Sequence, residues 1–241
     1  MESKLYQDMA ALEETHWWFV ARRKILKDVI GRLPLPANAS VLEAGCGTGG
    51  NLSMLSDFGK LSAFEPFDNA RAIADTRHIG QVENGTLPDG IPFEQKFDLI
   101  CAFDVLEHVE NDAAALKALA EKLAPSGHIV ITVPAFMFLW SAHDTAHHHY
   151  RRYTRQQMVR LMQSAGLEVK QASYFNTILF PAIVAARGLK KILGETDSPD
   201  AKMPSPGINR LLLWLFGAER LALRHINLPV GVSVLAVGWK A

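Results

Sequence analysis

The chain has 241 residues, enough to bury the core of one α/β domain of ordinary size. Its 25 basic residues balance its 25 acidic residues, so the zero formal net charge gives no sign of a surface that collects nucleic acid. The two cysteines have no framework of partners, which excludes a disulfide scaffold. We therefore expect a reducing, cytoplasmic environment.

Residues 1–36 predict a helical cap that precedes the sheet. The first residues carry charge and open no apolar run, so we expect no signal peptide. From residue 5 to residue 33 the apolar spacing is that of a helix, with Trp18 and Arg22 on one line, until Pro34 and Pro36 end it. The alternative for these side chains is an ordinary amphipathic helix with a solvated basic face.

Residues 37–179 alternate short apolar runs with helical patterns, and this alternation predicts a doubly wound parallel sheet with helices on both faces. With the last strand in residues 230–241, we expect a single α/β domain. The strands are predicted near residues 41–42, 61–64, 98–103, 128–133, 169–175 and 231–239.

Residues 180–229 form a mostly helical insertion before the last strand, longer than ordinary connections. Its apolar stretches are shorter than the ~20 residues that span a bilayer. The segment is apolar and mildly basic, which suits an amphipathic lid that admits a lipid-linked substrate at the inner face of a membrane. The alternative is an apolar face packed on the sheet or on a second copy of the chain.

A glycine-rich loop, Gly45-Cys46-Gly47-Thr48-Gly49-Gly50, follows the first predicted strand and opens a helix. Such a turn lets a ligand approach the backbone closely. Gly45, Gly47 and Gly50 also fit the dinucleotide fingerprint, with Glu65 about 20 residues further on. A carboxylate at the strand end, Glu43, favours a cationic ligand over a pyrophosphate. The absence of a following substrate domain also argues against a nicotinamide enzyme.

Four motifs in order resemble those of class I S-adenosylmethionine-dependent methyltransferases, over nearly the whole chain. Residues 41–49 resemble the family's first motif, which contains the glycine loop, and Glu65-Pro66 resembles the acidic residue that holds the ribose. Residues 85–88 resemble the stretch that flanks the adenine, and residues 97–108 resemble the motif that faces the methionine portion. The resemblance implies a Rossmann-like, seven-stranded, mostly parallel sheet whose last strand is antiparallel, and S-adenosylmethionine as cofactor. The cofactor-binding residues that it implies are Glu43, Gly45, Gly47, Gly49, Glu65, Pro66, Gly85, Thr86, Leu87, Asp104, Val105 and His108, with Trp18 and Arg22 closing over them from the cap.

Two parts of this resemblance stay open. Many members carry an aspartate beside the position of Gly85, whereas the neighbours here are Asn84 and Thr86, so an amide or a main-chain group must bind the adenine. For Asp104 and His108, the alternative is a helix cap and a packing contact.

The segment from Pro134 to Tyr153 is dense in reactive side chains and leaves the sheet at the edge where ligands bind. It resembles a run in one methyltransferase subgroup that also shares residues 16–19, His-Trp-Trp-Phe. An imidazole suits the removal of a hydroxyl proton near neutral pH. We predict His143 or His149 as base, oriented by Asp144, and Trp140, Arg151, Arg152 and Tyr153 as substrate-binding residues.

The arginines and histidines of this segment also have alternative roles. The arginines could instead pair with Asp144 and Glu107 to hold the loop. His143 and His147 have the i, i+4 spacing of a metal pair, but Pro134 and the loop composition argue against a helix, so we predict no metal.

These observations predict methyl transfer from S-adenosylmethionine to a small or lipid-linked acceptor, at oxygen, by a monomer or homodimer. The alternatives are an NAD(P)-dependent oxidoreductase and a non-catalytic protein that binds S-adenosylmethionine.

Overall fold

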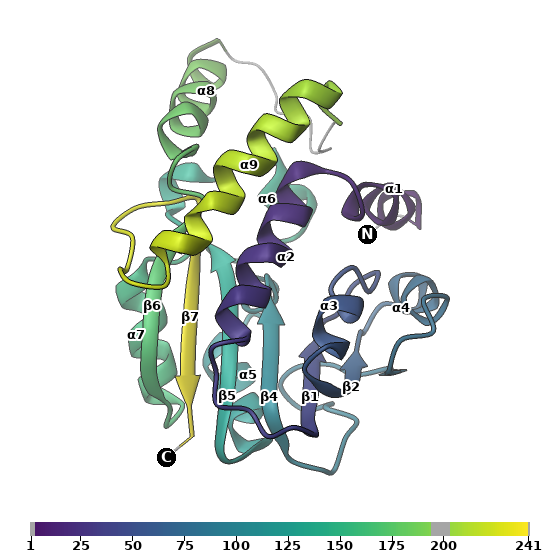
Figure 1. Ribbon diagram of the computed structural model, residues 1–241. Helices are drawn as coiled ribbons and strands as arrows, with labels where there is room; N and C mark the ends of the chain where they lie inside the picture. The colour runs from purple at the N-terminus through teal and green to yellow at the C-terminus, as the bar shows by residue number, and fades with distance from the viewer. Residues whose placement is uncertain (1–2, 194–202, 241) are drawn as a thin grey trace.

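The computed structural model describes residues 3–193 and 203–240. Its centre is a seven-stranded sheet with the order β3-β2-β1-β4-β5-β7-β6, flanked by helices (Figure 1). The strands are β1 Ala39–Ala44, β2 Gly59–Phe64, β3 Gln81–Glu83, β4 Phe97–Phe103, β5 Leu123–Pro134, β6 Glu168–Phe175 and β7 Ser233–Trp239. The prediction of a doubly wound α/β sheet is confirmed.

The strand directions follow from the connections. β1 pairs in parallel with β2 and β4, and β4 pairs in parallel with β5, because helices carry the chain back between these strands. β7 runs antiparallel between β5 and β6, as expected of the last strand. The central strands are buried along almost their whole length, which matches their continuous apolar sequences.

The helices cover both faces of the sheet. They are α1 Ser3–Glu13, α2 Trp17–Ile30, α3 Leu52–Ser56, α4 Asp68–Asp75, α5 Asp112–Glu121, α6 Ala142–Ala146, α7 Arg155–Ser164, α8 Phe180–Leu193 and α9 Pro206–Ala222, with short 3₁₀ turns η1 Leu106–His108 and η2 Met137–Leu139.

The cap is two helices, and the expectation of one continuous helical pattern from residue 5 to residue 33 is wrong. The chain breaks between α1 and α2, where His16 takes an extended conformation and its Nδ1 accepts a hydrogen bond from the main-chain N–H of Trp18 at 3.3 Å. A side chain that caps the new helix satisfies a donor that a continuous helix would have paired internally.

A short helix, α6, forms where the sequence favoured a loop. The main-chain N–H of Ser141 donates to the Asp144 carboxylate at 2.8 Å, and the Ser141 hydroxyl is held by the same carboxylate at 3.1 Å. This capping box at the first turn stabilises the helix despite the preceding Pro134.

The described part of the insertion consists of α8 and α9, while residues 194–202 lie outside the described part of the chain. α9 lies along α2 (Figure 1). The Trp17 ring packs edge-on to Phe216 at 6.0 Å, and the main-chain N–H of Trp17 donates to Asn209 Oδ1 at 2.8 Å. Within the described residues, no helix is long and apolar enough to cross a membrane.

Candidate active site

A cavity of about 1150 Å³ lies at the carboxyl ends of the parallel strands, enclosed by the cap, the loop after β5 and α8. Ligands of open α/β sheets bind at this edge. The volume exceeds that of an ordinary single-ligand pocket, so the cavity has room for a nucleoside-sized cofactor together with a second molecule.

The glycine loop turns beneath this cavity through left-handed backbone conformations. Gly45 and Gly47 have φ values of 64° and 55°. A Cβ atom on Gly45 would lie 2.9 Å from the Val105 side chain, whereas a Cβ on Gly47 would meet no atom within 4 Å. Both glycines line the cavity, and the open space beside Gly47 is where a ligand can touch the main chain.

Gly49 serves packing instead, since a Cβ there would come within 2.8 Å of Leu52. Gly85 is similar, because its Cβ would lie 2.7 Å from Pro92. Among the described residues, neither glycine lines the cavity, although both were predicted to bind the cofactor.

Glu65 joins the loop to the end of β2. Its Oε2 accepts a hydrogen bond from the Gly47 N–H at 2.9 Å, and its Oε1 accepts one from the Phe67 N–H at 3.1 Å. Burial raises the pKa of Glu65, and these main-chain bonds act in the opposite direction. The carboxylate lines the cavity together with Pro66, Thr86 and Leu87, the other residues of these motifs that were predicted to bind the cofactor.

Glu43 does not line the described cavity, although it was predicted to face a cationic ligand there. Glu43 is 1% exposed and lies behind the loop, where its Oε1 accepts a hydrogen bond from Asn51 Nδ2 at 2.8 Å. Burial raises the pKa of Glu43 to about 8, so the group is mostly uncharged at neutral pH. Asn51 lines the cavity and Glu43 is not among the lining residues described, so Glu43 acts by holding the loop.

The cap meets the end of β4 through an ion pair. Arg22 reaches Asp104 Oδ2 at 2.7 Å and donates to Thr132 Oγ1 at 2.8 Å, and its guanidinium lies 4.9 Å from the centre of the Trp18 ring. Trp18, Arg22, Asp104 and Val105, which were predicted to bind the cofactor, all line the cavity. The left-handed conformation of Asp104, with φ of 57°, turns the chain into η1.

The cap also contributes Glu13, which the sequence analysis missed. Glu13 is buried in the cavity wall and pairs with Arg77 at 2.8 Å. A glutamate at the end of an amphipathic helix carries no signal of this contact, because the contact depends on how α1 packs against α4.

In the segment after β5, the buried carboxylate of Asp144 holds Arg152 and His149, both of which were predicted at the site. Asp144 has no exposed surface. Its Oδ1 accepts a hydrogen bond from Arg152 Nε at 2.7 Å, and its Oδ2 accepts one from Arg152 Nη2 at 2.9 Å. Its Oδ1 also lies 2.9 Å from His149 Nδ1. Burial would raise the pKa of Asp144, but the bonds from His149 and Arg152 outweigh burial and hold the pKa well below its usual range.

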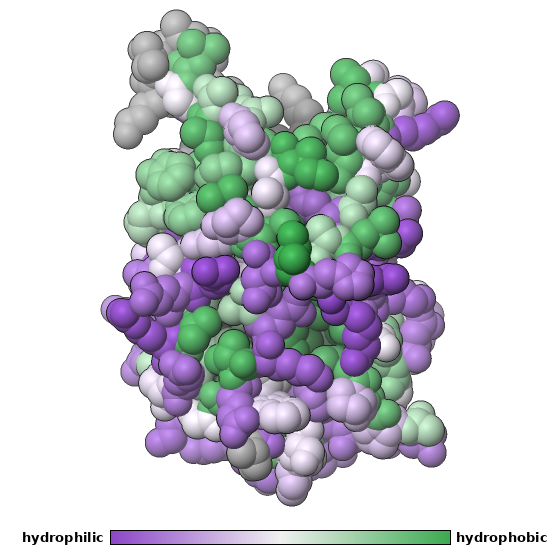
Figure 2. All heavy atoms as spheres, turned by 60° about the vertical axis from the view of Figure 1, so that its left-hand side comes forward, coloured by the Kyte–Doolittle hydropathy of each residue, from purple (hydrophilic) through white to green (hydrophobic). Residues whose placement is uncertain are grey.

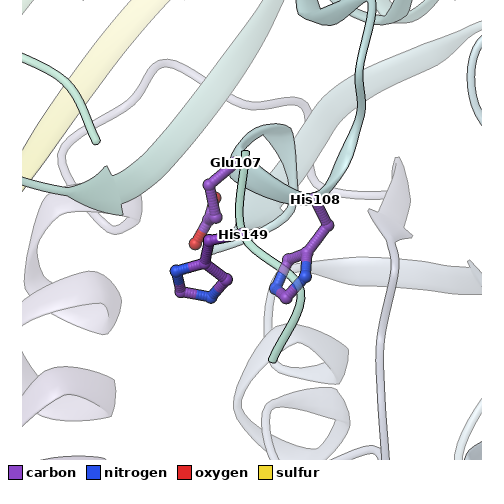
Figure 3. A group of neighbouring side chains, drawn as sticks. All are labelled: Glu107, His108 and His149. Carbon is purple, nitrogen blue, oxygen red and sulfur yellow. The ribbon is translucent and has the colours of Figure 1, made fainter. Parts of the chain in front are cut away.

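His149 lies beside Glu107 and His108 (Figure 3). The rings of His108 and His149 are edge-on, with centres 4.5 Å apart. Burial lowers the pKa of His108 to about 4, and the neighbouring His149 acts in the same direction. The rings of His143 and His147 pack against each other at a tilt, with centres 4.1 Å apart, and all four histidines line the cavity with Glu107.

The structure does not bring three predicted substrate-binding residues to the described cavity wall. Arg151 pairs with Asp112 at 2.9 Å, and the buried Tyr153 hydroxyl donates to the same Asp112 at 2.8 Å. Trp140 is partly exposed and donates to Thr145 at 3.1 Å. Arg152 does line the cavity, but its charge is committed to Asp144, which is the loop-holding role weighed as an alternative.

The described residues suit S-adenosylmethionine. The open space beside Gly47 admits a ligand to the main chain, the Glu65 carboxylate beside it can accept ribose hydroxyls, and the following residues Pro66, Phe67 and Leu87 offer an apolar wall for a base. Asp104 stands further along, where the methionine portion of such a ligand would reach.

Comparison with known proteins agrees with this geometry. Residues 18–172 match the model of a family described as a methyltransferase domain. An uncharacterized methyltransferase of Staphylococcus carnosus is 36% identical over 107 residues, which are 43% of this chain and 51% of that protein. A probable S-adenosylmethionine-dependent methyltransferase of Mycolicibacterium smegmatis is 25% identical over 169 residues, 66% of this chain and 62% of that protein. The matches thus span little more than half the length of these relatives.

Among solved structures, a chain in the complex between the Haloferax volcanii Trm112 methyltransferase activator and a methyltransferase has the same fold. Its TM-score is 0.63 at 16% identity, with 99% of this chain and 95% of that chain covered. At this identity the likeness concerns the fold alone.

Proposed function

Since this chain belongs to the methyltransferase domain family, whose cofactor is S-adenosylmethionine, we propose that it transfers the cofactor's methyl group to an oxygen of a small or lipid-linked acceptor. The observation that carries this proposal is one continuous cavity with two chemically different ends. The glycine loop and Glu65 line one end, and the histidines with Glu107 line the other.

The first end is proposed to bind the cofactor. Glu65 would hold the ribose, Gly45 and Gly47 would let the main chain approach, and Thr86 and Leu87 would flank the adenine. Trp18 and Arg22 of the cap close the same space from above, and Asp104 and Val105 mark the passage toward the second end. When bound there, the cofactor supplies an electrophilic methyl group.

The second end is proposed to bind the acceptor. Methyl transfer is an in-line displacement, so the protein mainly has to position the oxygen and assist the loss of its proton. Of the two histidines predicted as bases, His149 is the one that Asp144 orients. We assign His149 the contact with the acceptor oxygen, Asp144 its positioning, and His143 a place on the path of the proton.

The surface around the lid supports a hydrophobic acceptor. Figure 2 shows apolar residues gathered over the end of the molecule that carries α8 and α9, and hydrophilic residues over the opposite end. Several large apolar side chains there are exposed, with Trp214 at 68% and Phe138 at 66%, together with Ile178, Leu189, Ile208 and Leu211. Ile183 and Ala186 on α8 continue this apolar character into the cavity, as expected of a lid that admits a lipid-linked molecule from a membrane surface.

Ligand binding and product analysis test the proposal. In isothermal titration, S-adenosylmethionine and S-adenosylhomocysteine should bind the wild type, bind Glu65→Ala much more weakly, and bind Lys60→Ala as strongly as the wild type. Binding of NAD(H) in their place would contradict the cofactor assignment. Incubation of cell extract with methyl-labelled cofactor should then place the label in small-molecule or lipid fractions, and label confined to nucleic acid would contradict the acceptor class.

A further inference from the structure

Three side chains with metal-ligand chemistry converge on the acceptor end of the cavity. Glu107 and His108 lie in η1, directly after β4, and His149 comes from the loop after α6. One ligand atom from each lies within 4.8 Å of the other two. Figure 3 shows the three side chains side by side and pointing to the same side.

The Glu107 carboxyl group, one of these three, lacks a hydrogen-bond partner within the part of the chain that the structure describes. Its side chain has no exposed surface, and neither oxygen has a hydrogen-bond partner in another described residue. A buried carboxyl group without a partner costs folding free energy in either protonation state, because even the neutral acid must place its O–H. Arg22 and Arg152, the nearest cations, are committed to Asp104 and Asp144. A cation at the convergence point would give the Glu107 carboxylate the partner that it lacks among these residues.

The two histidines are held as metal-binding histidines usually are. A histidine ligand typically donates its second ring nitrogen to a carboxylate or to the main chain, which fixes its orientation. His149 uses Nδ1 for the buried Asp144, at 2.9 Å, and so presents Nε2. His108 forms a hydrogen bond with the main chain of His147 through one ring nitrogen, which leaves the other for a ligand.

We propose that Glu107, His108 and His149 bind a divalent transition-metal ion of the Zn²⁺ class at the acceptor end of the cavity. Two imidazoles and one carboxylate with a remaining open position form a donor set that such ions take. Ligands around a tetrahedral ion lie roughly 3.3 Å apart when bonds are about 2.0 Å long, so small side-chain rotations bring the 4.8 Å triangle into range. His143 and His147 flank the ion without belonging to the triangle.

The site deepens the proposed function and depends on it only for the identity of the fourth ligand. With the ion bound, the acceptor hydroxyl would take the open position, and the ion's charge would favour loss of its proton to His143, whose ring lies 6.0 Å from that of His149. The oxygen then forms a bond to the methyl carbon while the carbon–sulfur bond breaks and its electron pair stays on sulfur. His149 thus acts on the oxygen through the ion.

Metal binding is tested without any acceptor. The purified chain is stripped with a chelator and titrated with Zn²⁺ by calorimetry and with Co²⁺ by visible absorption, whose ligand-field bands report imidazole coordination. The wild type should bind one equivalent. Glu107→Gln and His149→Asn should each weaken binding by at least ~100-fold, since even the loss of an outer partner weakens metal sites by ~10–100-fold.

His148→Asn is the matched control. His148 belongs to the same loop, is exposed, and has a φ of 56° that asparagine tolerates, so this variant should bind metal like the wild type. Titration of each variant with S-adenosylhomocysteine shows whether it is folded, because the cofactor end does not contain the substituted residues.

Failure of the inference is separable from failure of the proposed function. A wild type that binds cofactor but no Zn²⁺ or Co²⁺ would overturn the metal site and leave His149 as the base. Equal metal binding by wild type, Glu107→Gln and His149→Asn would also overturn it, and loss only in His143→Asn would assign the metal to the His143–His147 pair instead. Metal binding without cofactor binding would retain the site and reject the methyltransferase function.

Discussion

Asp144 gives the sharpest test of how the acceptor wall is held. Substitution with asparagine removes the negative charge that faces the buried Arg152 guanidinium. The guanidinium would keep its hydrogen bond to the Ala135 carbonyl, at 3.0 Å, but would have no ionic partner. Loss of one partner from a buried pair costs about 3–5 kcal/mol. For a domain of this size we therefore expect the melting temperature to fall by roughly 6–20 °C.

The control for this prediction is an exposed ion pair on the surface. Lys27 and Asp57 approach to 2.5 Å, but both side chains are more than half exposed. Asp57→Asn should therefore cost less than about 1 kcal/mol. Urea denaturation of both variants, with the slope unchanged, measures the difference.

An Asp144→Asn variant that unfolds at the same urea concentration as Asp57→Asn would refute this reasoning. The double variant Asp144→Asn/Arg152→Met sharpens the result. Because it removes the unpaired charge as well, it should be more stable than the sum of the two single losses. Additive losses would mean that the two side chains do not depend on each other.

Three further predictions follow from the described contacts. Glu43 has a folded-state pKa near 8, above the ordinary value of 4.5, so the stability it contributes is complete below pH 4.5 and is lost as the pH rises through 8. Between pH 5 and pH 8 the free energy of unfolding of Glu43→Gln should therefore rise relative to that of the wild type, by up to about 1.4 kcal/mol per pH unit, as measured by urea denaturation. Gly47→Ala should weaken binding of S-adenosylhomocysteine in calorimetry, because its methyl group enters open cavity space, whereas Gly166→Ala, with equally open space and a φ of 79° but far from the loop, should bind normally. Trp214→Ser should reduce co-sedimentation with anionic vesicles without changing cofactor affinity, and unchanged sedimentation would argue against the lid as a membrane contact.

The sequence predicted the parts of the fold that depend on local pattern. Continuous apolar runs placed the central strands, and the glycine motif after β1 fixed the position of the ligand-binding edge. The cap was placed but its break was not, because the break depends on one histidine ring that accepts a hydrogen bond from the next helix. Likewise α6 required the capping contact of Ser141 with Asp144 to outweigh the nearby proline.

Residues predicted from a motif that constrains the backbone lie at the cavity, whereas several charged residues predicted for the substrate pair with other side chains instead. Gly47 lies in the turn after β1, and Glu65, at the end of the neighbouring strand β2, accepts a hydrogen bond from the Gly47 main-chain N–H, so both line the cavity. Arg151 was expected at the substrate, yet it pairs with Asp112, and Arg152 is neutralised by Asp144. Side-chain pairing across the fold decides such cases, and spacing along the sequence does not encode it.

The same distinction explains why Glu107, considered from the sequence only as a partner for an arginine, was not predicted as a ligand. In the sequence it lies between Leu106 and His108, and an exposed glutamate on a helix would be the ordinary expectation. In the structure η1 turns it inward beside His108, and the loop after α6 brings His149 against both. A carboxylate buried without a partner is unfavourable for stability, so its position is best explained by a ligand. The Asp144–Arg152 pair stabilises the loop that delivers His149, and it thereby links the stability of this wall to the chemistry proposed for it.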